Sequence, residues 1–296
     1  MVRENKVEIV EVPDWTGFTS NIKPVCPLVI RLNGSDTYFC HLDNRPVKFL
    51  NKFHEKRALQ NADALLSVSQ YTADLTNELF GLNRNFSIIP NSIDTDKFSN
   101  ESFENVVENT ILYFGTLIRK KGALELPFIF NEVYKRNKDA KLILIGRDAS
   151  DIISGNSSTW QMMQPLFDHD AKQNVSYLGS VPYEEIKAHI TTSAVCVFPT
   201  FAEALPVSWI EAMAMKKAIV ASDIGWAVEV IDDSINGYLV HPKQHQLYAD
   251  KIIQLLDNKE VRNNFGMEAR KKAVQKFSIE VVAAQSVDFY KKVIKK

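Results

Sequence analysis

Two glutamates around a predicted helix start are the residues best placed for chemistry in this sequence. Glu203 and Glu211 stand eight positions apart, and the segment PVSWIEAMAMK (206–216) has the leading proline and apolar run typical of a helix. Proline is well tolerated as the first helical residue, so we expect the helix to begin near Pro206. Glu203 is then in the preceding loop, and Glu211 is about one and a half turns into the helix.

This arrangement suits a ligand that combines an anion with hydroxyl groups. The amino end of a helix has free N–H groups and a positive dipole end, which favour phosphate. The two carboxylates would accept hydrogen bonds from hydroxyls, one from a ribose diol and one from a sugar ring. The pattern therefore favours a nucleotide sugar. Acids near helix starts are common, so an ordinary loop residue at Glu203 and a solvated helix residue at Glu211 remain the alternative.

A basic turn, GTLIRKKG (115–122), follows an apolar run and precedes a predicted helix. In an open parallel sheet such a loop opens on the ligand crevice. Its cations Arg119, Lys120 and Lys121 could hold a diphosphate and stabilise negative charge as the bond to it breaks. The turn matches neither a P-loop nor GxGxxG, which disfavours ATP hydrolysis and nicotinamide binding. A solvated basic turn is the alternative.

Composition limits the other possibilities. The 296 residues are 45% hydrophobic and 24% charged, enough for about two globular domains. The net charge of -1 gives no global field for nucleic acid or anionic lipid. The three cysteines lack metal-type spacing and suggest free thiols in a reducing compartment. The N-terminus lacks the apolar core of a signal peptide, and no run approaches the roughly 18 apolar residues of a membrane span, so we expect a cytoplasmic protein.

Short β-branched runs alternate with helix-like stretches, which is typical of an α/β fold with parallel sheets. In the second half, strands are predicted at 110–115, 141–146, 174–179, 195–200, 218–223 and 237–242. The helices there are predicted at 123–137, 183–193, 206–216, 244–257 and 259–276. Together they make one complete doubly wound domain, which follows a polar linker at 99–109.

The first hundred residues provide fewer elements. Strands are predicted at 7–12, 28–33, 64–69 and 86–91, and helices at 45–61 and 71–80. The glycine-rich strand–turn–helix that opens most doubly wound domains is absent, so we expect an incomplete Rossmann-like domain.

Three stretches together resemble the retaining glycosyltransferases of family four, which have the GT-B fold of two Rossmann-like domains. They are the run from YLGSVPYEEI to NGYLVHP (177–242), IIPNSIDTDKF (88–98) and YFGTLIRKKG (113–122). The resemblance extends from Val7 to the C-terminus and is strongest at 174–242. It implies a partial acceptor-side domain at 1–100, a nucleotide-sugar domain at 101–280 and a C-terminal helix at 281–296 that crosses back to the first domain.

The resemblance also implies roles for single residues. Glu203 would contact the hydroxyls of the donor sugar and Glu211 the ribose diol, while Lys121 matches the family's diphosphate-binding lysine. With Arg119, Glu203 and Lys121 form the expected catalytic set. The remaining expected donor-side residues are Gly115, Thr116, Gly179, Val181, Ala204, Leu205, Pro206 and Val207.

The sequence departs from the family pattern at several positions. Thr116 stands where the family usually has an arginine, and Arg119 is the expected substitute. Ala204 replaces a glycine, and Trp226 follows Gly225 where Gly-Gly is frequent, which narrows the space beside the donor sugar. Asn33, the expected acceptor-side residue, stands where many relatives carry a histidine; an asparagine cannot act as a general base.

Family members normally have several strands and a glycine-rich loop before a segment like VEIVEVPDW (7–15). Their absence here predicts either a truncated product or a gap filled by a partner chain, with an unpaired strand edge prone to self-association.

The expected activity is transfer of a sugar from a UDP- or GDP-sugar to a saccharide or lipid-linked acceptor, with retention, in polysaccharide or glycolipid biosynthesis. No cofactor and no metal are expected, since no Asp-x-Asp pair lies between a strand and its turn and the cations would stabilise the leaving group. A donor-binding fragment without turnover and a nucleotide-sugar epimerase are the alternatives. No nucleic acid partner is expected.

The basic, amphipathic segment 46–60 could touch a membrane bearing the acceptor at the inner face, or be a solvated surface helix. Trp209 and Met213 are expected in the core, and the six scattered histidines are expected to be structural or exposed.

Overall fold

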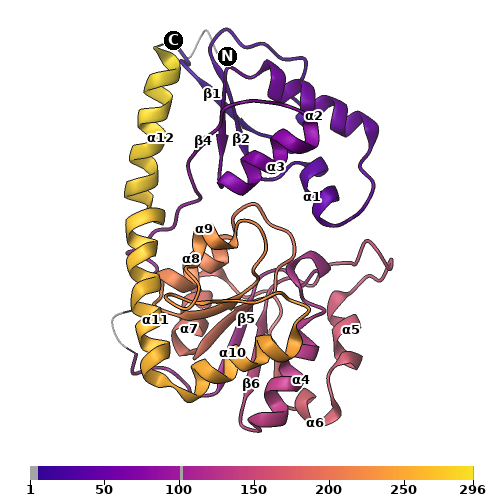
Figure 1. Ribbon diagram of the computed structural model, residues 1–296, viewed down its shortest axis with the longest axis vertical. Helices are drawn as coiled ribbons and strands as arrows, with labels where there is room; N and C mark the ends of the chain where they lie inside the picture. The colour runs from indigo at the N-terminus through magenta and orange to yellow at the C-terminus, as the bar shows by residue number, and fades with distance from the viewer. Residues whose placement is uncertain (1–5, 101–102, 296) are drawn as a thin grey trace. The chain divides into compact units, whose positions relative to one another are not determined.

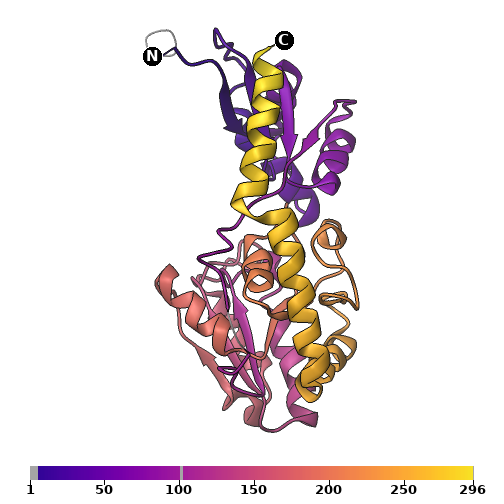
Figure 2. The same cartoon turned by 90° about the vertical axis from the view of Figure 1, so that its left-hand side faces the viewer.

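The computed structural model describes residues 6–100 and 103–295, which form two compact units (Figures 1 and 2). Unit 1 contains the chain up to Ser92, the short stretch Ala202–Leu205 and the segment from Phe277 onward. Unit 2 contains Ile93–Phe201 and Pro206–Lys276. The first boundary thus lies some residues before the linker expected from composition.

Unit 1 is a four-stranded parallel sheet with helices on both faces (Figure 1). Its strands, in spatial order, are β1 (Val10–Pro13), β2 (Leu28–Leu32), β3 (Ala64–Ser67) and β4 (Ser87–Ile88). Its helices are α1 (Asp36–Leu42), α2 (Phe49–Asn61), α3 (Gln70–Phe80) and α12 (Ile279–Ile294), with a 3-10 turn η1 (Trp15–Gly17) after β1.

Alternation along β2 explains why both faces of this sheet are covered. Ile30 and Leu32 point to one face, where they pack with Leu59 of α2 and Phe80 of α3. Val29 points to the opposite face, which is covered by α12. A strand buried on both sides has apolar residues on both faces, which is the pattern of LVIRL apart from Arg31, whose guanidinium pairs with Glu11.

Unit 2 is a six-stranded parallel sheet with the order β10-β9-β8-β5-β6-β7. Its strands are β5 (Thr110–Phe114), β6 (Lys141–Ile145), β7 (Val175–Tyr177), β8 (Val195–Phe198), β9 (Ala218–Ala221) and β10 (Tyr238–Leu239). Its helices are α4 (Leu126–Arg136), α5 (Thr159–Met163), α6 (His169–Lys172), α7 (Tyr183–Thr192), α8 (Val207–Ala214), α9 (Ala227–Val230), α10 (His245–Asp257) and α11 (Lys259–Lys272). The order reverses between β5 and β8, and such a switch point is where ligands bind in open α/β sheets.

The ten predicted strands and the expected α/β class with two Rossmann-like parallel sheets are confirmed, and the strand order reverses in the sheet of unit 2 but not in that of unit 1. The short helices α1, α5, α6 and α9 were not predicted, because four to seven residues are too few to show a helical period. Helix α2 begins at Phe49 rather than 45, after Pro46, since the residue before a proline avoids helical geometry. Helix α11 ends at Lys272 and continues as a π-helical turn (Ala273–Phe277).

The burial of single residues agrees with the expectations from the sequence. Trp209 and Met213 are fully buried, as expected for core residues. Cys26, Cys40 and Cys196 are free thiols.

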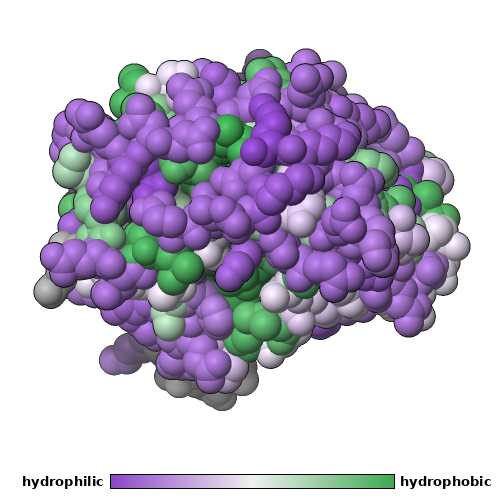
Figure 3. Space-filling model, turned by 90° about the horizontal axis from the view of Figure 1, so that it is seen from below, coloured by the Kyte–Doolittle hydropathy of each residue, from purple (hydrophilic) through white to green (hydrophobic). Residues whose placement is uncertain are grey.

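Among the described helices, none has the length and apolarity required to cross a membrane. Hydrophilic residues cover most of the face in Figure 3, and the hydrophobic residues there form separate small areas.

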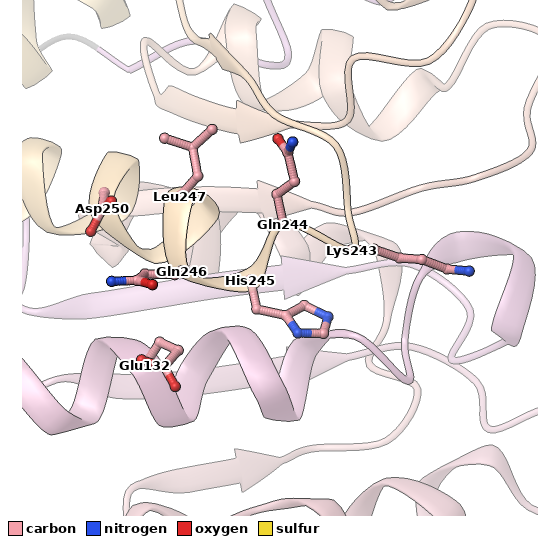
Figure 4. Close-up of a pocket in the computed structure, with 7 residues that line it drawn as sticks. All are labelled: Glu132, Lys243, Gln244, His245, Gln246, Leu247 and Asp250. Carbon is pink, nitrogen blue, oxygen red and sulfur yellow. The ribbon is translucent and has the colours of Figure 1, made fainter.

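Surface hollows also occur away from the switch point. One of about 600 Å³ lies on unit 2 beside the start of α10 and is drawn in Figure 4. Its His245 contacts Glu125 Oε2 through Nε2 at 2.7 Å and stacks on the ring of Phe128. These contacts fix the helix start, which fits the structural role expected for the histidines.

Candidate functional site

The basic turn after β5 is fixed against the loop after β8, at the switch point of unit 2. Its three cations form the 3-10 turn η2 (Arg119–Lys121), which Gly122 ends with a left-handed φ of 72°. A Cβ at Gly122 would lie 1.7 Å from the carbonyl oxygen of Pro199, so only glycine permits this approach. The Phe201 N–H also donates to the Lys120 carbonyl at 2.8 Å. The turn after β5 and the loop after β8 are therefore in direct contact.

Glu211 is buried, not solvated. Its side chain lies on α8, is only 6% exposed and accepts a 2.7 Å hydrogen bond at Oε1 from the hydroxyl of Tyr183. Burial raises the pKa of Glu211, while the Tyr183 hydrogen bond and the positive charge of Lys121 oppose that rise. The alternative of a solvated helix residue is excluded, and Lys121 is close enough to act on this carboxyl.

Tyr183 was missed by the sequence analysis. It is the first residue of α7, its hydroxyl pKa is raised by burial and by the Glu211 carboxylate, and it contacts two residues from the start of unit 2. The Phe98 ring centroid lies 5.5 Å from its own, and Lys97 Nζ lies 5.2 Å from it. Its position shortly after the loop Gly179–Val181 is a possible signal in the sequence. Its hydrogen-bond partner Glu211 lies 28 residues away, so the contact itself could not be predicted.

The start of α8 differs by one residue from the prediction. Pro206 has φ −75° and ψ 121°, so it is the extended residue before the helix, and Val207 is the first helical residue. The placement still leaves the N–H groups of the first turn available, with Glu211 in the second turn.

Arg119 has a different partner from the one expected. Its Nε and Nη2 each donate to a separate oxygen of Asp151 at 2.8 Å. Asp151 is almost fully buried, and these bonds with those from Ser154 hold its pKa below the usual range. A bidentate pair with a buried carboxylate fixes geometry, although the Arg119 side chain is itself 39% exposed. Asp151, which the sequence analysis missed, therefore anchors the η2 turn to the loop after β6.

The other expected donor-side residues of unit 2 lie at the carboxyl ends of its strands. An ideal Cβ on Gly115 would lie 3.8 Å from Lys121 Cδ, so the Lys121 side chain runs past the end of β5. The Thr116 carbonyl accepts from the Tyr113 hydroxyl at 2.9 Å. Gly179, with φ 70°, accepts from Gly146 N–H at 2.8 Å and begins the loop through Val181 to α7.

Glu203, Ala204 and Leu205 belong to unit 1, whereas Glu211 and Lys121 belong to unit 2. The carbonyl of Glu203 accepts from the Tyr38 hydroxyl at 2.8 Å, and that of Ala204 accepts from the Ser69 hydroxyl at 3.0 Å. The expectation that the two glutamates share one pocket therefore stays a prediction.

The acceptor-side residue Asn33 is exposed at the end of β2, and its N–H donates to Asp14 Oδ1 at 3.0 Å. Asp14 is buried at the end of β1, and burial raises its pKa to about 7, against the hydrogen bonds from the Asn33 and Gly34 backbone. The sequence analysis missed this acid, because nothing in VEIVEVPDW distinguishes a buried aspartate from a solvated one.

Family models match nearly the whole chain. The model of the glycosyl transferases group 1 matches residues 94–272, and that of glycosyltransferase family 4 matches residues 1–97. Among similar proteins, the alpha-maltose-1-phosphate synthase of Mycolicibacterium smegmatis is 25% identical over 81% of this chain and 65% of its own length. The alpha-D-kanosaminyltransferase of Streptomyces kanamyceticus is 25% identical over 62% of this chain and 45% of its own.

Solved structures share the fold. The sucrose-phosphate synthase of Thermosynechococcus elongatus has a TM-score of 0.82 at 18% identity, covering 99% of this chain and 75% of that one. Anabaena HepE in complex with UDP-glucose has a TM-score of 0.76 at 17% identity, covering 90% and 72%. Of the relatives matched by sequence, several are longer than this chain, which spans about two thirds or less of their length.

The buried carboxyl of Asp14 predicts a pH-dependent stability. Its folded pKa of about 7 lies above the ordinary value of 3.8, so the folded state binds the proton more tightly and loses stability as pH rises from about 4 to 7. Asp14→Asn should remove this loss, so its unfolding free energy should gain about 4 kcal/mol relative to the wild type between pH 4 and pH 8.

Urea unfolding of both proteins at the two pH values measures this difference, with Asp288→Asn, at an exposed position in the same unit, as the control. An Asp14→Asn variant that follows the wild-type pH profile would show that Asp14 is ionised in the folded protein.

Proposed function

Because the chain belongs to the glycosyl transferases group 1 family, we propose that it takes part in retaining transfer of a sugar from a nucleoside-diphosphate sugar to an acceptor hydroxyl, in polysaccharide or glycolipid biosynthesis. The observation that carries the proposal is the buried carboxyl of Glu211, which contacts Tyr183 and lies within the electrostatic reach of Lys121 at the switch point of unit 2. The catalytic set proposed from the sequence is Glu203, Lys121 and Arg119.

Glu211 is proposed to hold the ribose. Tyr183 donates to only one of its two oxygens, and an ionised carboxylate can accept several hydrogen bonds. A ribose diol could therefore bind Oε2 without breaking the Tyr183 contact. The loop from Gly179 to Val181 precedes Tyr183 and is the proposed border of the base.

The diphosphate is proposed to lie between Lys121 and the first turn of α8. The N–H groups after Pro206 and the lysine ammonium would stabilise the charge that develops on the leaving phosphate. Arg119 has two of its donors bound to Asp151, so we assign it mainly to positioning the turn that carries Lys121. With these roles, Lys121 stabilises the leaving group and no metal is required. Transfer activity should therefore persist when a chelator is added.

The sugar and acceptor are proposed to use residues of unit 1. Glu203 is assigned to the hydroxyls of the donor sugar, with Ala204 and Leu205 beside it. Asn33 is exposed and suited to hydrogen-bond a saccharide, but it cannot remove a proton from the acceptor. HepE, a structural neighbour, was solved with UDP-glucose, which makes UDP-glucose the first donor to test. Since relatives are longer, donor binding without turnover is the second candidate.

Calorimetric titration of the chain with UDP tests the role of Glu211. Glu211→Gln should weaken UDP binding by about 10- to 100-fold, because hydrogen bonds to a charged acceptor contribute about 1.5–3 kcal/mol. Glu203→Ala should leave free UDP binding nearly unchanged and weaken only the UDP-sugar. Glu185→Gln, at an exposed site on α7, is the matched control. Equal losses for free UDP in the two glutamate variants would contradict the assignment.

Tyr183→Phe should change how UDP binding depends on pH. The Tyr183 hydrogen bond lowers the pKa of Glu211, so its removal should raise that pKa and protonate the carboxyl at a higher pH. The decline of UDP affinity on acidification should then begin at higher pH than in the wild type. Titrations at several pH values measure this shift, and an unshifted profile would show that Tyr183 does not act through Glu211.

A further inference from the structure

Unit 1 carries a group of exposed, bulky apolar residues on two adjacent segments. The group contains Trp15, Phe18 and Ile22, on and after η1, and Phe49, Leu50 and Phe53 in the first turns of α2. Their exposed fractions lie between 47% and 79%. We call these six residues the η1–α2 surface. Single exposed apolar residues are ordinary, but a cluster of large ones marks an interaction site.

The two segments are held side by side by specific contacts. The Thr16 N–H donates to Glu55 Oε1 at 3.2 Å, and Ser20 Oγ contacts His54 Nδ1 at 2.8 Å. A Cβ on Gly17 would lie 2.2 Å from the backbone of His54, so the loop lies directly on the helix. The two segments that carry the exposed apolar residues are therefore fixed against one another and are not a loose loop.

The two segments are also rich in cations. Residues 14–25 and 46–61 contain the five cations Lys23, Lys48, Lys52, Lys56 and Arg57. Their only two acids, Asp14 and Glu55, are both buried. The chain as a whole has a net charge of -1, so this excess of positive charge is local.

We propose that the η1–α2 surface docks the protein on an anionic lipid bilayer. Aromatic side chains favour the interfacial zone of a bilayer, and lysines and arginines beside them are attracted to anionic headgroups. Anionic headgroups complement the five cations, and neither acid of these two segments is exposed to repel them. The combination of aromatic residues and cations therefore selects a lipid surface.

The η1–α2 surface lies near the expected acceptor side of unit 1, so docking would serve the proposed function, on which this step rests. Trp15 directly follows Asp14, whose carboxyl accepts the Asn33 N–H on the expected acceptor side of unit 1. A bilayer that contacts Trp15 and Phe18 would bring a lipid-linked acceptor next to Asn33. Of the two acceptor classes expected from the sequence, the lipid-linked one is favoured.

Co-sedimentation of the full chain with vesicles tests the docking without donor or acceptor, so its outcome is independent of the proposed transfer. We expect binding to phosphatidylcholine vesicles containing about 30% phosphatidylglycerol, at least tenfold weaker binding to pure phosphatidylcholine, and weakening by salt. Phe49→Ser with Phe53→Ser should reduce binding at least tenfold, and Lys48→Gln with Lys52→Gln should remove the preference for the anionic vesicles.

The matched control is Ile152→Ser with Ile153→Ser, which removes two exposed apolar residues from unit 2 and should not change vesicle binding. A blue shift of Trp15 fluorescence on vesicle addition should disappear in Trp15→Phe while binding remains. Absence of binding, or binding unchanged by the paired phenylalanine substitutions in a variant that unfolds at the wild-type temperature, would overturn the proposal. Self-association that only those substitutions abolish, without vesicle binding, would instead assign the surface to a second copy of the chain.

Discussion

The burial of one carboxyl group, that of Glu211, is the constraint on which the account of unit 2 depends. Moving a carboxylate out of water costs several kcal/mol unless hydrogen bonds and a nearby positive charge compensate. Here Tyr183 supplies the hydrogen bond and Lys121 the charge. The rest of α8 is mostly buried and apolar, so an apolar residue at this position would give a simpler core. A ligand that needs the carboxylate explains why the helix has an acid there.

The surrounding structure keeps the cation beside that carboxyl. Gly122 allows the basic turn to lie against the loop after β8, and the pair of Arg119 with Asp151 fixes the other side of the turn. These contacts fix the backbone of the turn that carries Lys121. Less conformational entropy is then lost when the turn binds a diphosphate. The fixed backbone and the Arg119–Asp151 ion pair thus preorganise a site whose functional groups come from three separate segments, the η2 turn, the start of α7 and α8.

Sequence alone predicted the strands and the long helices, because buried parallel strands read as apolar runs and long helices repeat their apolar residues. It also placed Glu211 and Lys121 at the correct end of the sheet. It missed Tyr183, Asp151 and Asp14, because each is identified by a contact with a residue 19 or more positions away. Residue type and local spacing do not indicate contacts between residues so far apart in the chain. The role of Arg119 was incompletely predicted for the same reason.

The central claim is that the loops around Glu211 and Lys121 bind a nucleoside diphosphate. Hydrogen exchange of the full chain, measured by mass spectrometry with and without UDP, tests it most directly. The account predicts slower exchange in 115–122, 179–183 and 206–211, with no change in the exposed segment 257–260 of the same unit. Protection confined to other segments, or none at saturating UDP, would contradict it.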